Sequence, residues 1–97
     1  MKIIEVQQLN DAVLVRGEVQ LDERKYQAVY LYERQTFLGH QGQTIVNWTC
    51  KLTGASYKAQ DGSRRRVSKH HKNVRHDLFF IPHQVFRNEL LTTGVLH

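Results

Sequence analysis

The sequence has one cysteine, one proline and one methionine among its 97 residues, and it contains no long apolar run. A lone cysteine, Cys50, excludes an intrachain disulfide and any zinc site built from paired cysteines. The absence of long apolar stretches argues against a membrane-spanning helix, and the first residues carry no apolar signal-peptide core. These absences predict a protein of a reducing compartment, and we expect a cytoplasmic protein without cofactor, metal or membrane contact.

Ninety-seven residues suffice for one domain with one hydrophobic core. The apolar fraction of 40% and the charged fraction of 24% are ordinary for a soluble domain. No repeat or low-complexity linker divides the chain, so the sequence predicts a single domain over residues 1–97.

The positive charge is concentrated in the second half of the chain. Residues 1–50 carry five Lys/Arg against six Asp/Glu, whereas residues 51–97 carry nine against three. Residues 64–76, which we call the basic run, contain six Lys/Arg, three His and no acid. Like charges packed this closely repel one another, so a polyanion such as a nucleic-acid backbone is the expected partner.

Apolar and polar residues alternate in several stretches with the period of two that is typical of β-strands. These stretches are residues 12–21, 26–33 and 44–53, with a partner strand at 3–9. Residues 35–43 contain Gly39 and Gly42 and are expected to form a loop. Asp61-Gly62 is a hairpin signal, expected to join strands over 56–60 and 64–69. Trp48 alternates with Val46, Cys50 and Leu52, so we expect it to be largely buried.

The end of the chain has the features of a helix. Residues 78–81 (Leu-Phe-Phe-Ile) predict a short apolar strand, and Pro82 suits the first position of a helix after it. Gly94 suits the position just beyond the helix end. The pattern predicts a mainly β (α+β) fold, with a small antiparallel sheet or partly closed barrel of five to seven strands and one carboxy-terminal helix.

The basic run is the main candidate for a functional site. In an extended strand its arginines would point to both faces, which argues against core packing and favours a protruding basic hairpin or an edge segment over residues 64–76. The sequence therefore predicts a non-catalytic protein that contacts nucleic-acid phosphates. Its candidate contacts are Arg64, Arg65, Arg66, Lys69, His70, His71, Lys72 and Arg75, with Tyr57 and Lys58 before the turn.

The alternatives to this interpretation come from other classes. The basic run could be a solvated edge strand that resists aggregation, or the protein could be an adaptor or inhibitor that binds an acidic protein surface. A metal-independent ribonuclease would need histidines with neighbouring cations, for which the candidates are His70, His71, His76, Arg66 and Tyr57. DNA and RNA, single or double stranded, all remain compatible with the pattern, and it leaves the oligomeric state open.

Aromatic residues offer a second route to nucleic-acid contact. Tyr26, Tyr30 and Tyr32 share one face of a predicted strand, and Tyr57 lies close to the basic run. Tyrosines on an exposed sheet face stack on bases, whereas the same row on a covered face packs in the core. We expect the core arrangement for the three on one strand.

Overall fold

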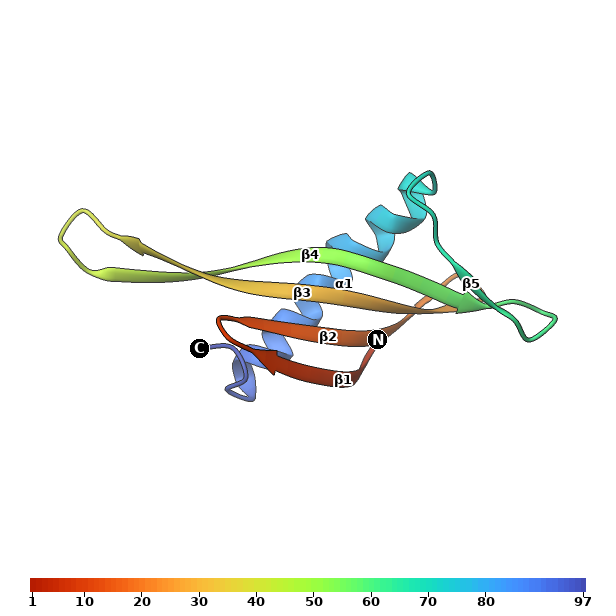
Figure 1. Cartoon of the computed structure of the whole chain (residues 1–97), viewed down its shortest axis with the longest axis horizontal. Coiled ribbons are helices and arrows are strands. Elements are labelled where there is room, and N and C mark those ends of the chain that lie inside the picture. Colours follow the sequence, from red (N-terminus) through yellow and green to blue (C-terminus); the bar gives the residue numbers. More distant parts are fainter.

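A computed structural model describes all residues, 1–97, as an open antiparallel sheet with one helix packed against a single face (Figure 1). The elements are β1 (Lys2–Leu9), β2 (Ala12–Leu21), β3 (Arg24–Leu38), β4 (Thr44–Lys58), β5 (Arg64–Arg66) and α1 (Lys72–Thr92). The strands lie side by side in chain order. The mainly β fold with one carboxy-terminal helix is confirmed with five strands, and the sheet does not close into a barrel.

The predicted alternation places apolar side chains under the helix. Val13, Val15 and Val19 of β2 are buried and lie beside the buried residues of β3, because Val15 pairs with Tyr30 in the antiparallel register. The core is completed by residues of β4, α1 and the segments that follow β5 and α1. Its members are Val13, Val15, Val19, Tyr26, Ala28, Tyr30, Tyr32, Ala55, Val67, Leu78, Phe86, Leu90 and Leu96. We call the opposite side of the sheet, away from α1, the open face.

The helix begins ten residues earlier than predicted. Residues 78–81 are not a strand, and Pro82 lies inside α1 rather than at its first position. The buried helix residues Leu78, Pro82, Phe86 and Leu90 are spaced by four, so they form one stripe that faces the sheet. The short apolar stretch is therefore part of a longer helical pattern that a four-residue window does not reveal. Gly94, with φ of +82°, follows the helix end as expected.

A proline inside a helix leaves a carbonyl without its usual donor, because proline has no amide proton. The carbonyl concerned is that of Leu78, four residues before Pro82. The hydroxyl of Tyr30, which is buried in β3, donates a hydrogen bond to this carbonyl oxygen. Tyr32 donates similarly to the carbonyl oxygen of His83 at 2.8 Å. The sheet thus supplies a donor at the position where the helix lacks one.

The helix approaches β2 closely because one core position has no side chain. A Cβ atom added to Gly17 would lie 2.5 Å from ring atoms of Phe86. Phe86 is fully buried and meets the ring of Tyr30 edge to face, with the ring centroids 5.4 Å apart. Gly17 therefore makes room for the largest helix side chain in the core.

The β3–β4 hairpin is much longer than the sequence indicated. The predicted loop over 35–43 is correct only for residues 39–43, because β3 continues to Leu38 and β4 begins at Thr44. The distal part of this hairpin, residues 35–46, projects beyond the helix (Figure 1) and gives the molecule extents of 57 × 26 × 22 Å. We call it the hairpin arm. Trp48, at its base, is only partly buried against the core.

The turn at Asp61-Gly62 is present, with Gly62 at φ of +88°. The amide of Ala59 donates to the carbonyl of Ser63 at 2.8 Å and closes the turn. The strand after it is shorter than predicted: β5 covers only Arg64–Arg66. The rest of the basic run forms a connecting segment, residues 67–71, and the first turn of α1.

Candidate nucleic-acid interface

The three arginines of β5 point to both sides of the sheet. Arg65 pairs with Tyr57, whose side chain lies on the helix side, while Arg64 and Arg66 pair with Lys58 and Ser56. Alternation along the strand therefore places Arg64 and Arg66 on the open face. All three arginines are exposed, and β5 is an edge strand paired only with β4.

A groove of about 680 Å³ lies on the open face beside β5. Polar and apolar residues of β3 and β4 form the floor of this groove. The segment from Arg66 to Lys69 lies along its border. Four cationic side chains line it, and no Asp or Glu does. We call this hollow the basic groove. Its four cations are Arg16, Arg66, Lys69 and Arg75.

Local contacts position two of the groove residues. The Arg75 guanidinium donates to the carbonyl oxygen of Leu52 at 3.4 Å, so it lies over the edge of β4. Arg16 forms an ion pair with Glu5 of β1, with 3.3 Å between nitrogen and oxygen. Both partners of this pair are about half exposed, so the pair contributes little stability and leaves Arg16 free to exchange Glu5 for an anion.

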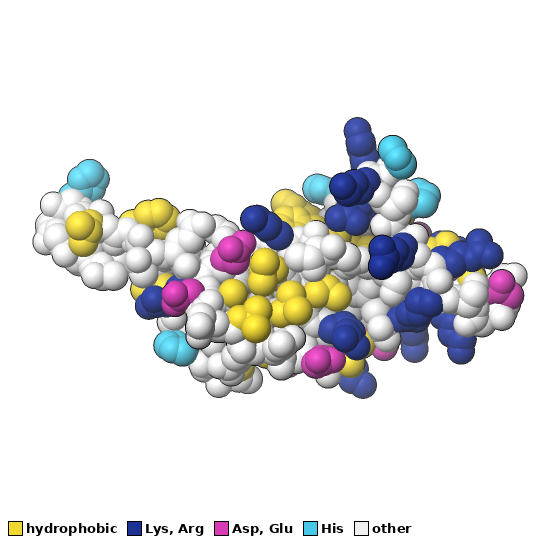
Figure 2. Space-filling model, viewed as in Figure 1, with side chains coloured by type: hydrophobic (Ala, Val, Ile, Leu, Met, Phe, Trp, Pro, Cys, Tyr) yellow, Lys and Arg dark blue, Asp and Glu magenta, His cyan; other side chains and the backbone are white.

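The open face of the molecule shows the same segregation of charge. Figure 1 shows the sheet in front of the helix, and in the same view Figure 2 shows Lys and Arg side chains gathered toward the β5 end of the molecule. The middle of this face carries an apolar patch in the same view. Alternation along β2 and β3 places the cross-strand pair Leu14 and Leu31 on this face, together with Val29, which lines the groove. The basic groove therefore adjoins an apolar surface.

The start of α1 adds to the positive field near the groove. Its first turn contains no acid, and no side chain caps its free amides. The unpaired amides and the helix dipole place partial positive charge at this end. Lys72 is its first residue, so the helix terminus and the basic run act with the same sign.

The segment before the helix holds the two adjacent histidines in a turn. The amide of His70 and a ring nitrogen of His71 both lie 3.3 Å from the hydroxyl oxygen of Ser68. Lys69, His70, His71 and Lys72 are all exposed. They are therefore accessible to a large ligand that also reaches the basic groove.

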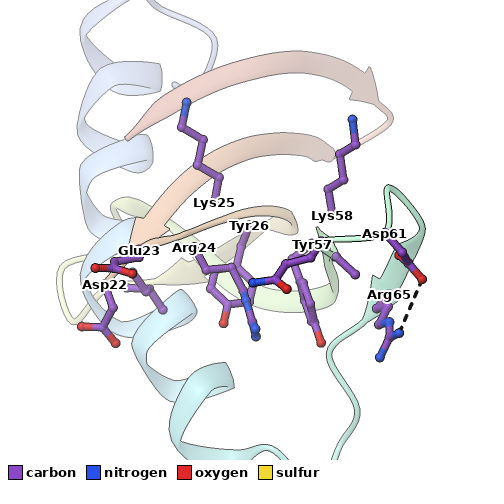
Figure 3. Close-up of a pocket in the computed structure, with 12 residues that line it drawn as sticks. Asp22, Glu23, Arg24, Lys25, Tyr26, Tyr57, Lys58, Asp61 and Arg65 are labelled. Atoms are coloured by element: carbon purple, nitrogen blue, oxygen red, sulfur yellow. Dashed lines mark ion pairs between the residues drawn. The ribbon is translucent and has the colours of Figure 1, made fainter.

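A second hollow, of about 780 Å³, lies on the helix side near the β2–β3 and β4–β5 turns (Figure 3). The guanidinium of Arg24 covers the ring of Tyr57, with 4.0 Å from its carbon atom to the ring centroid. Tyr26 meets the same ring edge to face at 5.6 Å. Arg24 and Tyr26 thus cover part of the Tyr57 ring. Lys58 extends from the opposite side of its strand.

Acidic groups distinguish this second hollow from the basic groove. Its lining includes Asp22, Glu23 and Asp61. Asp61 lies 3.8 Å from Arg65, and hydrogen bonds from Ser63 hold the pKa of the Asp61 carboxyl below its usual range. The carboxylate is therefore ionised at neutral pH and opposes a second anion. The helix-side hollow suits a polyanion less well than the basic groove does.

The three tyrosines of β3 are core residues. Tyr26, Tyr30 and Tyr32 are buried, which excludes base stacking on their rings. Burial, with a smaller effect of Cys50, raises the pKa of the Tyr30 and Tyr32 hydroxyls, so both remain protonated donors. Tyr57 is the one tyrosine that is only partly buried.

The remaining candidate chemistry does not assemble in one place. No group of three or more His, Cys, Asp or Glu side chains is placed to hold a metal ion. His76 stacks on Phe80 of its own helix with ring centroids 5.3 Å apart, whereas His71 contacts Ser68. These contacts give the histidines separate surroundings.

Sequence reasoning missed Arg16 as a groove residue. The alternation over residues 12–21 places Arg16 on the exposed face of its strand, but its proximity to the basic run depends on the register of β2, β3 and β4. Arg16 pairs with Val29, and Val29 pairs with Gly54 in the floor of the groove. The alternation of side chains along one strand does not reveal which residues of the neighbouring strands lie beside Arg16.

No protein-family model, curated protein or solved structure matches this chain. Its one helix lacks the combination of length and apolarity needed to cross a membrane.

Proposed function

We propose that the protein binds nucleic acid, without a catalytic role, through the basic groove and the adjoining basic run, except Arg65, which faces the helix side of the sheet and pairs with Asp61. The observation that carries this proposal is the acid-free lining of the groove, where Arg16, Arg66, Lys69 and Arg75 converge from three parts of the chain. Guanidinium groups suit phosphate oxygens because they can donate two parallel hydrogen bonds. The exposed cations outside the groove, among them Arg64 and Lys72, extend the same surface along a phosphate backbone.

Two matched double variants test the proposal, because each removes two positive charges from one side of the sheet. The open-face variant combines Arg66→Ala with Lys69→Ala, and the helix-side control combines Arg24→Ala with Arg65→Ala. Binding to labelled single- and double-stranded DNA and RNA is measured by fluorescence anisotropy. We expect the open-face variant to weaken binding by about tenfold or more, which is about 1.4 kcal/mol, and the control to weaken it much less.

The pattern of losses decides the outcome. Equal losses in both variants would show that net charge alone drives binding, and a larger loss in the control would assign the site to the helix-side hollow. Either result would refute the basic groove as the binding site. Circular dichroism of both variants checks that the loss does not come from unfolding.

A second candidate function is binding to an acidic protein. It is favoured by the apolar patch of Leu14, Val29 and Leu31 beside the groove, since protein interfaces combine apolar and charged groups. Polyglutamate is the discriminating probe. Binding to polyglutamate without binding to any oligonucleotide at low salt would favour the acidic protein over nucleic acid.

A further inference from the structure

The outer edge of β4 has no partner over much of its length. β5 pairs only with Ser56–Lys58, the amide of Val67 bonds the carbonyl of Ala55, and Arg75 reaches the carbonyl of Leu52. Residues 44–51 therefore have β3 on one side and no strand on the other. Their outward amides and carbonyls can pair with another extended chain.

This free edge lacks the features that protect the opposite edge of the sheet. The other edge strand, β1, carries Lys2 and Glu5, and its pairing is broken by an irregularity between Ile3 and Glu5. Residues 44–50 of β4 contain no charge, no proline and no irregularity in register. Natural edge strands use charges, prolines and bulges to prevent pairing with another chain. An edge of this length without these features favours such pairing.

The hairpin arm exposes apolar side chains that no part of this chain covers. Phe37 and Leu38 are 49% and 81% exposed, and Ile45 and Val46 are 45% and 38% exposed. The arm is a two-stranded ribbon beyond the reach of α1 (Figure 1), and such a ribbon is marginal in water by itself. A strand paired along β4 would give Ile45 and Val46 apolar neighbours and widen the two-stranded ribbon into a sheet.

We propose that the occupant of this edge is a second copy of the same chain, with β4 paired antiparallel to β4 of the partner about a two-fold axis that passes through Trp48. Such an axis places each residue opposite one of the same strand face, so the apolar row of Val46, Trp48 and Cys50 meets the same row of the other copy. Lys51, the one charged residue of the stretch 44–51, then lies opposite the uncharged Ile45, and Asn47 lies opposite Thr49.

The pairing joins two five-stranded sheets into one continuous sheet of ten. Each hairpin arm lies beside the body of the other protomer, which explains why the arm extends past its own helix. The two open faces lie on the same side of the joined sheet. This proposal does not depend on nucleic-acid binding, because it rests on the β4 edge alone.

Multi-angle light scattering with size exclusion, over a dilution series, tests the dimer. We expect a mass of twice 11.4 kDa at high concentration. The edge variant Asn47→Lys with Thr49→Lys places like charges across the proposed two-fold axis and should give the monomer mass. The control Gln7→Lys places a charge on the opposite edge strand, β1, and should leave the dimer intact. Circular dichroism reports whether both variants are folded.

Hydrogen exchange of the wild-type chain provides a readout that needs no variant. Amides of residues 44–51 should exchange more slowly as the concentration rises, while those of β1 should not change. A monomer at every concentration would overturn the proposal. So would a dimer that survives the charges on β4, or one that Gln7→Lys disrupts.

Discussion

The hydrogen bond from Tyr30 to the carbonyl of Leu78 predicts a measurable dependence of stability on Pro82. Tyr30→Phe removes the one donor that replaces the missing proline amide, and it leaves a buried carbonyl without a partner. An unsatisfied buried polar group costs about 1–3 kcal/mol. We expect Tyr30→Phe to lower the free energy of unfolding by that amount.

A double-mutant cycle isolates the effect. Pro82→Ala restores an amide that can bond the carbonyl of Leu78 from within the helix, so the Tyr30 hydroxyl should matter less in that background. We expect a coupling energy between the two substitutions of about 1 kcal/mol, measured by urea denaturation of the four proteins. Tyr32→Phe serves as a comparison, because the carbonyl of His83 lies one residue beyond the proline and has a helical amide available at Arg87.

Two results would refute this reasoning. If Tyr30→Phe has no effect on stability, the carbonyl of Leu78 does not depend on the tyrosine. If the two substitutions are additive, the tyrosine does not compensate for the proline, and its contribution comes from packing alone.

Three further predictions concern the core. Gly17→Ala should lower the free energy of unfolding by about 1–3 kcal/mol, because the new methyl group overlaps the ring of Phe86; urea denaturation measures this, and a neutral substitution would contradict the packing. Burial raises the pKa of the Cys50 thiol to about 11, so iodoacetamide at pH 8 should modify native protein far more slowly than protein in urea; equal rates would contradict this burial. Burial, and then the nearby Arg87, lower the pKa of His83 below its ordinary value of 6.5. The unfolded chain therefore binds a proton at His83 more readily than the folded chain does. The free energy of unfolding present above pH 6.5 should decline as the pH falls through the folded-state pKa of His83, and His83→Gln should reduce that decline. A pH dependence unchanged by His83→Gln would assign it to other groups.

Local patterns in the sequence predicted the main strands and the faces that β2 and β3 bury. The expected burial of Trp48 on β4 was wrong, because Trp48 is only partly buried and its neighbour Val46 is exposed. Asp61-Gly62 and Gly94 marked a turn and a helix end. These features depend on neighbours within a few residues, so they can be predicted without tertiary information.

The errors arose where tertiary contacts override local preference. Pro82 favours a helix start, but the hydroxyl of Tyr30 makes an interior position acceptable. Gly39 and Gly42 suggested a long loop, yet the turn they form is short and the strands extend to it. The contribution of Arg16 to the groove depends on pairing across three strands, which no single stretch of sequence reveals.

The salt dependence of binding tests the central claim most directly. Four cations line the basic groove and Arg64 and Lys72 extend it, so four to six phosphate contacts give a slope of log affinity against log salt of roughly −3.5 to −5.5 for duplex DNA. Replacing Arg66, Lys69 and Arg75 with Ala should make this slope less steep by roughly 3. A slope near zero for the wild-type protein, or one that the triple substitution does not change, would contradict phosphate binding in the groove.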